Sequence, residues 1–494
     1  MSQLKQYFGG KFHDATGAQW DIVNPATTKI IASTRLATVD EIDAAVAAAK
    51  SAFPAWSKMG LQARANLMLD LRQAVIDIRD ELAQLIMIET GKTITDATAE
   101  VTRTIEVMAV SVNATTLYAA PYTKGVSSGI NTYEVRYPVG VVAAISPFNF
   151  PVNIPLVQTM LAMACGNTVV LKPSERNPSA ILRVAEAFTK AGLPDGVFNV
   201  VLGGVDAVNR LVDHPDVPAI TFVGSTPVAR ALRARGAANN KRVQAFGGGK
   251  NHMVVMPDAD IDLVADAAVS AAFGAAGQRC MAISVVVAVG GAADKLVLAL
   301  KLRTEKIRMG DLADNSSQLG PVITEASLRR VTGYLENAES EGASIVIDGR
   351  DRNDQEEGYY VGPTLIDHVK PGMAVHRDEI FGPVLSVVRV DTFDEAIEVI
   401  SSHELGNGAA IFTQDGAVAE RFTDEAPAGQ IGINVPIPVP VFFHGFAGWK
   451  DSAFTETKLH GRDALAFLTQ TKTVSARWLG SQGSGVSLHF PSSN

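Results

Sequence analysis

The feature that most constrains the fold of this chain is a series of short apolar runs that alternate with helical patterns from residue 139 onward. The first runs predict strands at 139–145, 168–171, 197–202, 219–223 and 242–246. A second series predicts strands at 253–256, 283–289, 385–390, 409–412 and 430–435, separated by helices at 260–273, 325–340 and 394–401. Repeated strand–helix–strand units are typical of parallel, doubly wound sheets, which bind ligands at the carboxyl ends of their strands. The sequence therefore predicts an α/β fold with two doubly wound domains and a cleft between them.

The longest uncharged stretch, residues 138–171, is predicted to be a buried strand, a loop, a buried helix and a second strand. A membrane-spanning helix needs about 20 continuous apolar residues, whereas prolines, glycines and asparagines interrupt this stretch. The first residues of the chain also lack the basic-then-apolar order of a signal peptide. We therefore expect no membrane segment.

The first third of the chain is predicted to be mostly helical. Thr38 and Glu41 have the spacing of a capping box that starts a helix, and Pro54 is expected to close that helix. Two long amphipathic helices are predicted at 61–90 and 96–120. At the other end, the Gly/Ser-rich residues 481–494 are expected to form a loose tail.

Charge and cysteine content exclude several classes of protein. The 494 residues include 43 Lys and Arg against 52 Asp and Glu, a net charge of −9, which argues against nucleic acid as the main partner because phosphate binding needs a basic face. The two cysteines, Cys165 and Cys280, provide neither a disulfide scaffold nor a cysteine zinc site, and no metal is expected. Two lone thiols in an acidic chain indicate a reducing compartment, so we expect a cytoplasmic protein.

Residues 273–280 carry the main candidate for chemistry. An alanine-rich helix ends there in a glycine-rich turn that presents Cys280, and Arg279 beside it is expected to lower the pKa of the thiol. The alternative is a small buried core residue, which is what most free cysteines are, and spacing alone favours that alternative. The glycines at 91 and 247–249 match neither the P-loop nor the G-x-G-x-x-G spacing, so a dinucleotide site here would be irregular.

Seven motifs, in order along nearly the whole chain, resemble those of the aldehyde dehydrogenase superfamily. They are Asn24–Thr27, Ser146–Pro151, Gly166–Glu175, Phe222–Thr226, Gly248–Lys250, Gly277–Cys280 and Glu379–Val384. Within the superfamily the chain is similar to the methylmalonate-semialdehyde dehydrogenases, which acylate coenzyme A, at residues 147–151, 249–252, 434–440 and 469–474.

The resemblance implies an aldehyde dehydrogenase-like fold with three parts. They are a Rossmann-like NAD-binding domain (1–121 and 139–247), a catalytic domain (248–447) and a small oligomerisation segment (122–138 and 448–480). Strand segments at 122–138 and 465–478 would join subunits into a homodimer or homotetramer.

The resemblance also implies the role of each site residue. Cys280 would be the nucleophile that adds to an aldehyde carbon, and Asn149, otherwise a turn residue between two prolines, would stabilise the oxyanion together with the Cys280 backbone N–H. Hydride would leave to NAD, and the residues implied to bind it are Phe148, Lys172, Glu175, Gly224, Ser225, Glu379 and Phe381. A carboxylate at Glu175 would repel the 2′-phosphate of NADP, which favours NAD. Without the motif that follows it, Glu379 would be read as a solvated charge.

Position 246 departs from the pattern of the hydrolytic members, which have a glutamate four residues before the lysine that corresponds to Lys250. That carboxylate activates water, whereas Phe246 cannot take a proton. The resemblance therefore implies that coenzyme A, a better nucleophile toward a thioester, is the acyl acceptor. His252 is a candidate substitute base, although a histidine entering a buried strand is more often structural. A hydrolytic aldehyde dehydrogenase that releases a free acid is the alternative function, and a non-catalytic descendant is the second.

A malonate-type semialdehyde would need a carboxylate anchor, for which the planar fork of arginine is suited. The resemblance implies that Arg279 and Arg103 supply it, with an exposed helix cation as the alternative for Arg103. In the subfamily the malonyl-type thioester loses its carboxylate before transfer, which gives propionyl-CoA or acetyl-CoA.

Overall fold

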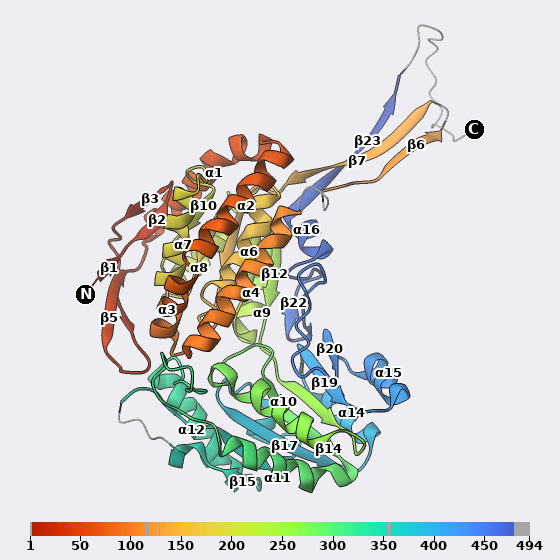
Figure 1. Ribbon diagram of the computed structural model, residues 1–494. Coiled ribbons are helices and arrows are strands. Elements are labelled where there is room, and N and C mark those ends of the chain that lie inside the picture. The colour runs from red at the N-terminus through yellow and green to blue at the C-terminus, as the bar shows by residue number, and fades with distance from the viewer. Residues whose placement is uncertain (1, 114–117, 128, 353–356, 479–494) are drawn as a thin grey trace.

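The computed structural model describes residues 2–113, 118–127, 129–352 and 357–478 (Figure 1). Its α-helices are α1 (Val39–Lys58), α2 (Leu61–Asp77), α3 (Arg79–Thr90), α4 (Ile94–Val112), α6 (Asn153–Ala164), α7 (Ser179–Lys190), α8 (Val205–Asp213), α9 (Thr226–Ala238), α10 (Ile261–Phe273), α11 (Ala293–Thr304), α12 (Glu325–Ser340), α13 (Ala374–Arg377), α14 (Phe393–Ser402), α15 (Gly416–Glu425) and α16 (Arg462–Leu468). Among the described residues, none of these helices has the length and apolarity that a membrane crossing requires.

An eight-stranded sheet forms the centre of the first domain. Its order is β22 (Ala453–Phe454), β12 (Arg242–Phe246), β11 (Ala219–Val223), β8 (Val141–Ile145), β9 (Thr168–Lys172), β10 (Phe198–Val200), β2 (Gln6–Phe8) and β3 (Lys11–His13). The five strands from β12 to β10 are parallel. Alternate residues of β8 and β9 face two different cores, one shared with α1, α8 and α9 and the other with α2, α3, α6 and α7. Burial on both faces explains why these strands are continuous apolar runs.

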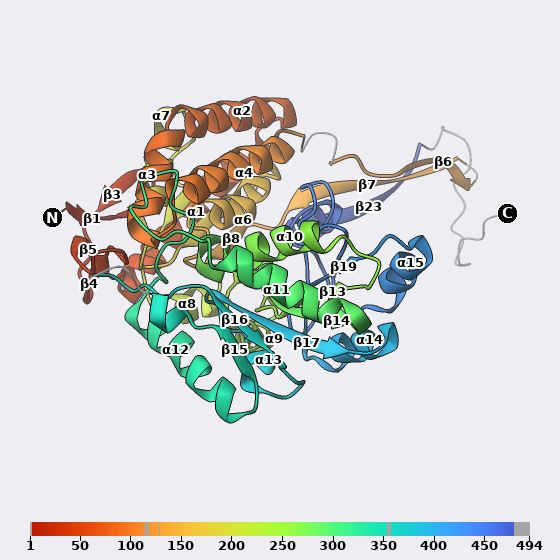
Figure 2. The same cartoon turned by 60° about the horizontal axis from the view of Figure 1, so that its bottom comes forward.

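A seven-stranded sheet forms the centre of the second domain. Its order is β15 (Ser344–Ile347), β16 (Thr364–Asp367), β17 (Val384–Val390), β14 (Ile283–Val289), β13 (Asn251–Val255), β19 (Gly408–Phe412) and β20 (Gln430–Ile433). All neighbouring pairs are parallel except β15 with β16. Helices α10 and α11 lie side by side over this sheet (Figure 2). The prediction of two doubly wound α/β units is therefore confirmed.

A third sheet projects away from both domains (Figure 1). It is antiparallel and consists of β6 (Tyr122–Ser127), β7 (Ile130–Pro138) and β23 (Thr469–Arg477). β23 pairs with β7 along its whole length, which brings together the two segments expected to join subunits. The residues just before β23 lie elsewhere, because β22 pairs with β12 and α16 packs into the core of the first sheet. The segment expected to begin at residue 448 therefore includes residues 453–468, which pack with the first domain. The tail expected at 481–494 lies outside the described residues.

The prediction of a mostly helical first third is wrong for its beginning. Residues 2–35 contain β2, β3 and a small sheet of β1 (Ser2–Leu4), β5 (Ile30–Arg35) and β4 (Gln19–Val23). β1, β2 and β3 have only three residues each, and β4 and β5 are partly exposed and are not continuous apolar runs. A last pair, β18 (Leu405–Gly406) with β21 (Trp449–Lys450), links the second domain to the C-terminal segment.

Helix boundaries in this region differ from the predictions for identifiable reasons. The Thr38–Glu41 capping box is confirmed, but α1 continues through Pro54 to Lys58. Trp56, almost fully buried and bonded through its indole N–H to the Met163 carbonyl, fixes that last turn and offsets the hydrogen bond that the proline removes. The helix predicted at 61–90 is two helices divided at Ile78, and the one predicted at 96–120 ends at residue 112.

Candidate active site

The carboxyl ends of the parallel strands of the first sheet carry several of the residues singled out above. Lys172 is the last residue of β9, and Phe246 is the last residue of β12. Asn149 lies four residues after the end of β8, and Gly224 and Ser225 follow β11 directly. Because carboxyl ends of parallel strands meet at one edge, the strand topology alone gathers these residues. Cys280 comes to the same edge from the second domain, between α10 and β14.

Cys280 lies in the wall of a cavity of about 370 Å³ between the two domains. Most of the lining is apolar and includes Phe246, so the position of the missing base faces the same space as the thiol. Arg103 and Arg279 line this cavity too. The structure therefore brings together three features that the sequence could only connect by resemblance: the lone cysteine, the phenylalanine and the two arginines.

The turn that presents Cys280 has an unusual backbone. Ala275, Ala276 and Gly277 have φ values of 52°, 54° and 69°. The left-handed region costs an alanine roughly 1–2 kcal/mol, so the surrounding contacts must hold this conformation. Gly277 could not be replaced, because an added Cβ would lie 2.1 Å from the Gly382 carbonyl oxygen. From α4, Asp96 Oδ2 accepts a hydrogen bond of 3.0 Å from the Ala275 N–H.

The environment of Cys280 raises the pKa of its thiol to about 11. Burial is the largest cause and the carboxylate of Glu379 is the second. Hydrogen bonds from the Cys280 and Met281 N–H groups and the charge of Arg279 act in the opposite direction but are outweighed. The expectation that Arg279 makes the thiolate available in the free enzyme is therefore wrong, because a desolvated anion beside a carboxylate is disfavoured.

The raised pKa of the Cys280 thiol predicts how the alkylation rate of the free enzyme depends on pH. Only the thiolate is alkylated, so the rate with iodoacetamide is expected to rise about tenfold per pH unit between pH 7 and pH 9. Cys165 is fully buried with a pKa raised to about 12, so the label should be absent from a Cys280→Ala variant. A rate that levels off below pH 8 would contradict the raised pKa of this thiol.

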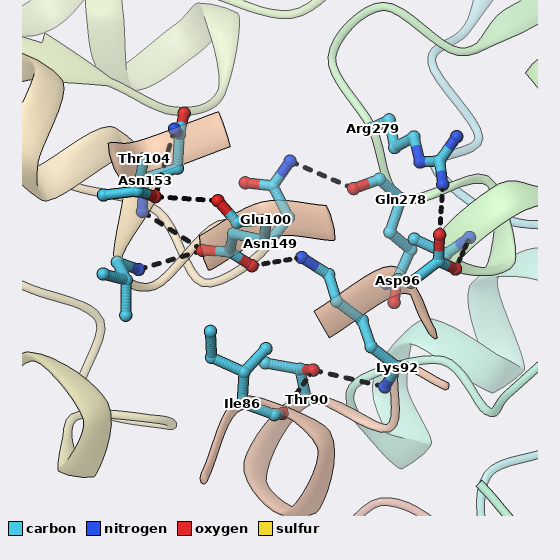
Figure 3. A network of polar contacts seen from close by, with 12 residues as sticks. Ile86, Thr90, Lys92, Asp96, Glu100, Thr104, Asn149, Asn153, Gln278 and Arg279 are labelled. Carbon is cyan, nitrogen blue, oxygen red and sulfur yellow. Dashed lines mark hydrogen bonds and ion pairs between the residues drawn. The ribbon is translucent and has the colours of Figure 1, made fainter. Parts of the chain in front are cut away.

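Asn149 is buried, and its side chain points toward the nucleophile segment (Figure 3). Its Nδ2 donates a 3.0 Å hydrogen bond to the carbonyl of Gln278, two residues before Cys280. An amide nitrogen has two N–H groups, so one remains for a second acceptor. The contact holds Asn149 against the segment that presents Cys280, where the resemblance implies a donor to the substrate oxyanion.

A buried ion pair braces the loop that carries Asn149 (Figure 3). Lys92 Nζ lies 2.6 Å from Glu100 Oε2, with side-chain exposures of 5% and 0%. Glu100 Oε1 also accepts the N–H groups of Val152 and Asn153 at the start of α6, so the carboxylate of one helix caps the next. Such a pair is costly to break because either charge alone would be left buried. No sequence pattern indicates this network, because Lys92 precedes α4 and lies eight residues from Glu100, outside the spacing of neighbouring side chains on a helix.

Both candidate arginines already have protein partners. Arg279 Nη2 lies 2.6 Å from Asp96 Oδ1, and Arg103 pairs with Glu106 and donates to the carbonyl of Pro440. Arg103 also lies over the ring of Phe442, 4.2 Å from its centroid. Arg103 lines the cavity, and its side chain is 35% exposed.

A second cavity, of about 590 Å³, lies between the start of α9 and the second domain. It is lined by Ser225, Thr226 and Glu379, so the amide-rich helix terminus and the carboxylate face one space. Glu379 Oε1 accepts the Gly249 N–H at 3.0 Å, and Lys250 holds the carbonyls of Val375 and Asp378 just before it. Glu379 is thus not a simple solvated charge. A helix N-terminus favours a phosphate group, so these residues fit a dinucleotide.

The remaining residues expected to bind the cofactor occupy two pairs. Lys172 Nζ lies 2.8 Å from Glu175 Oε2, and this contact helps to lower the pKa of the Glu175 carboxyl against the opposing effect of burial. The rings of Phe148 and Phe381 meet edge to face with centroids 5.9 Å apart. Phe381 has a φ of 54°, which turns the chain sharply after Glu379.

Two histidines, His252 and His460, come into consideration as bases for the reaction at Cys280. His252 is buried against His376, with 3.3 Å between their Nε2 atoms, and burial holds its pKa well below the usual value. It does not line the cavity of Cys280, so its structural reading is supported. His460 does line that cavity; its Nδ1 bonds the His444 carbonyl, and burial lowers its pKa to about 4. No sequence motif distinguished His460, whose position depends on the path of the C-terminal segment.

Comparison with known proteins agrees with the fold. Residues 12–474 match the aldehyde dehydrogenase family. The chain belongs to this family, whose members are oxidoreductases.

Individual relatives narrow the comparison. The chain is 46% identical to malonate-semialdehyde dehydrogenase 1 of Geobacillus thermodenitrificans, over 97% of this chain and 99% of the relative, and 43% identical to malonate-semialdehyde dehydrogenase of Pseudomonas aeruginosa, over 97% of both. The crystal structure of methylmalonate-semialdehyde dehydrogenase from Oceanimonas doudoroffii has a TM-score of 0.96, with 44% identity over 97% of this chain and 99% of that one. A structure from Sinorhizobium meliloti, provisionally named methylmalonate-semialdehyde dehydrogenase and complexed with NAD, has a TM-score of 0.96 and 43% identity over 97% and 99%.

Proposed function

We propose that this protein oxidises malonate semialdehyde or methylmalonate semialdehyde with NAD and transfers the acyl group to coenzyme A. The observation that carries the proposal is the cavity in which Cys280 faces Phe246 instead of a carboxylate base, with Arg103 and Arg279 in the same wall. The names of the relatives support the same substrates.

In this proposal Cys280 forms the covalent intermediate. Its thiolate adds to the aldehyde carbon, and the carbonyl oxygen becomes an anion that needs hydrogen-bond donors in place beforehand. The free N–H of the Asn149 amide and the Cys280 backbone N–H are the proposed donors. The Glu100–Lys92 pair, which holds the loop of Asn149, keeps the amide near the nucleophile segment.

NAD is proposed to be held at the second cavity, where it supplies the hydride acceptor. Gly224, Ser225 and the first amides of α9 would face its pyrophosphate, and a Cβ added at Gly224 would lie 2.5 Å from the ring of Phe222. Glu379 would hold the nicotinamide ribose, with Phe381 and Phe148 beside it. Lys172 and Glu175 would bind the adenosine ribose, where the carboxylate selects against a 2′-phosphate.

The wall at Phe246 explains why a thiol is the proposed acceptor. Water is a poor nucleophile toward a thioester unless a base removes its proton, and Phe246 removes no proton. His460 is a weak base because its pKa is lowered to about 4. Coenzyme A would attack the thioacyl carbon and release the Cys280 thiolate, so the products would be acetyl-CoA or propionyl-CoA after the substrate carboxylate leaves as carbon dioxide.

Product analysis with and without coenzyme A tests this proposal. With coenzyme A we expect fast steady-state NADH formation from either semialdehyde. Without coenzyme A we expect a single burst of NADH, followed by slow turnover as the thioacyl enzyme decays. The acyl-CoA and carbon dioxide should appear in equal amounts. Free acid formed at the full rate without the thiol would overturn the proposal in favour of a hydrolytic enzyme.

A substitution at position 246 provides a separate prediction. Phe246→Glu places a carboxylate beside the thiol, and we expect acid release without coenzyme A to rise at least about tenfold, because general bases contribute roughly 10²–10⁴-fold. Phe246→Gln is the matched control, since it has nearly the same shape and polarity but a neutral amide. An equal rise in both variants would show that admission of water, and not base catalysis, limits hydrolysis.

The assembly is proposed to be a homodimer or homotetramer that is joined through the sheet of β6, β7 and β23. The two outer strands of this projecting sheet, β6 and β23, each pair with β7 on one side only within the described residues. Their other edges are suited to pairing with another subunit.

A further inference from the structure

Asp96 is placed between the two parts of the site that must act together. It belongs to the first turn of α4, where the Thr93 side chain caps the helix by accepting the Asp96 N–H. Its two carboxylate oxygens have different partners: Oδ2 accepts the Ala275 N–H at 3.0 Å, and Oδ1 lies 2.6 Å from Arg279 Nη2 (Figure 3). Asp96 therefore contacts both the left-handed turn before Cys280 and the guanidinium in the cavity wall.

The position of Arg279 explains why it needs such a partner. Its side chain borders the cavity of Cys280 and also a separate cavity of about 490 Å³, on the side where Arg303 and Asp266 lie. An arginine without an anchor could turn into either space, and binding a substrate carboxylate would then cost the ordering of a long side chain. Asp96 uses one nitrogen of the guanidinium and leaves other N–H groups for a ligand.

Gly274 supports the same interpretation from the other side. A Cβ added there would lie within 2.4–2.6 Å of three guanidinium atoms of Arg279. The backbone of Gly274 has φ −54° and ψ 136°, which any residue can adopt, so its small size serves to leave room for the guanidinium and not to permit the turn.

We propose that Asp96 is a positioning residue that fixes Arg279 toward the substrate cavity and, through Ala275, holds the turn that presents Cys280. The part that concerns Arg279 rests on the proposed function, in which the substrate carries a carboxylate. Asp96 is then a determinant of the preference for anionic over neutral aldehydes, although it is itself an anion. Orientation outweighs its repulsion of the substrate, because its charge is already paired with the guanidinium.

The main experiment measures the ratio of kcat/KM for malonate semialdehyde to that for propanal, which has a methyl group in place of the carboxylate. We expect Asp96→Asn to lower this ratio about tenfold and Gly274→Ala to lower it as well, since each displaces Arg279 in a different way. Asp266→Asn is the matched control, because it removes a carboxylate paired with Arg303 in the neighbouring cavity without a contact to Arg279, and it should leave the ratio unchanged. An unchanged or increased ratio in Asp96→Asn would overturn the proposal.

A double-variant comparison separates this inference from the proposed function. If Arg279→Met leaves the ratio at the wild-type value, Arg279 does not bind the substrate carboxylate, and both that assignment and the specificity role of Asp96 are wrong. If Arg279→Met lowers the ratio but Asp96→Asn does not, only the role of Asp96 is wrong. In the Arg279→Met background, Asp96→Asn should cause no further loss.

The contact with the turn is tested without any substrate. Asparagine keeps an oxygen that can accept the Ala275 N–H, whereas alanine does not. We expect Asp96→Ala to speed alkylation of Cys280 by iodoacetamide at pH 7.5 at least fivefold, because a loosened turn exposes the thiol, and Asp96→Asn to restore a rate within twofold of wild type. Equal rates in Asp96→Ala and wild type would show that Asp96 does not hold the turn.

Discussion

Replacing Cys280 by alanine is expected to lower the rate of aldehyde-dependent NADH formation by at least about four orders of magnitude, because no other group in the cavity can form the covalent intermediate. The carboxylates of the cavity are engaged with cations, Glu100 with Lys92 and Asp96 with Arg279, and they are weak nucleophiles by comparison. The measurement is steady-state absorbance of NADH with malonate semialdehyde and coenzyme A.

Two controls make this result specific to the nucleophile. NAD binding, measured by calorimetry, should be retained in Cys280→Ala, since none of the proposed cofactor residues lines the cavity of Cys280. Cys165→Ala removes the other thiol from a fully buried position and should keep the activity, with a loss of stability of about 1 kcal/mol from the small cavity. Substantial activity in Cys280→Ala would refute the covalent mechanism, and loss of NAD binding would show that the variant is misfolded.

Replacing Asn149 by alanine is expected to lower kcat about 10²–10³-fold, the usual effect of removing one oxyanion donor. KM should change much less, because the donor acts on charge that develops in the transition state. The structure supports this expectation by placing the buried amide against Gln278, near the backbone of Cys280.

Asn153→Ala is the control for damage to the loop. Asn153 is the first residue of α6, and its side-chain amide donates a hydrogen bond to Thr104 Oγ1 of α4. Loss of this amide should change kcat only a few-fold. If Asn149→Ala raised KM and left kcat unchanged, Asn149 would contribute to binding or loop structure instead of stabilising the oxyanion. If both variants lost the same activity, the loop as a whole would be responsible.

Much of the fold could be predicted from local patterns. The run at 283–289 became a strand with the predicted bounds, because a buried parallel strand is an almost continuous apolar run, and the strands at 219–223 and 242–246 also have the predicted bounds. The failures have the opposite character. β1, β2 and β3 contain too few residues for a period, and β4 and β5 are partly exposed. α1 passes through Pro54 because Trp56 is held by a distant element.

The site divides in the same way. Phe246, Arg103 and Arg279 could be singled out from the sequence, and the structure places all three in the cavity of Cys280. The roles of Asp96, Glu100 and His460 could not be predicted, since none of them follows from neighbouring residues. The partners of Asp96 lie 179 and 183 positions away, Glu100 bonds residues 52 and 53 positions away, and His460 depends on the path of a late segment. The pKa of the Cys280 thiol was expected to be lowered, because Arg279 is its neighbour in sequence. It is raised instead, because burial and Glu379 outweigh Arg279, and neither is visible in the neighbouring residues.

The sequence by itself determined where the central parallel strands of the two large sheets form, which residue types stand at their ends, and that position 246 has no proton acceptor. These properties are local, because backbone preference and apolar periodicity act over a few neighbouring residues. The tertiary structure alone decided whether the thiol is charged, which way Arg279 points and what holds the loop of Asn149. Burial and electrostatic fields sum over atoms from several elements, and those atoms become neighbours only when the two domains close around the cavity.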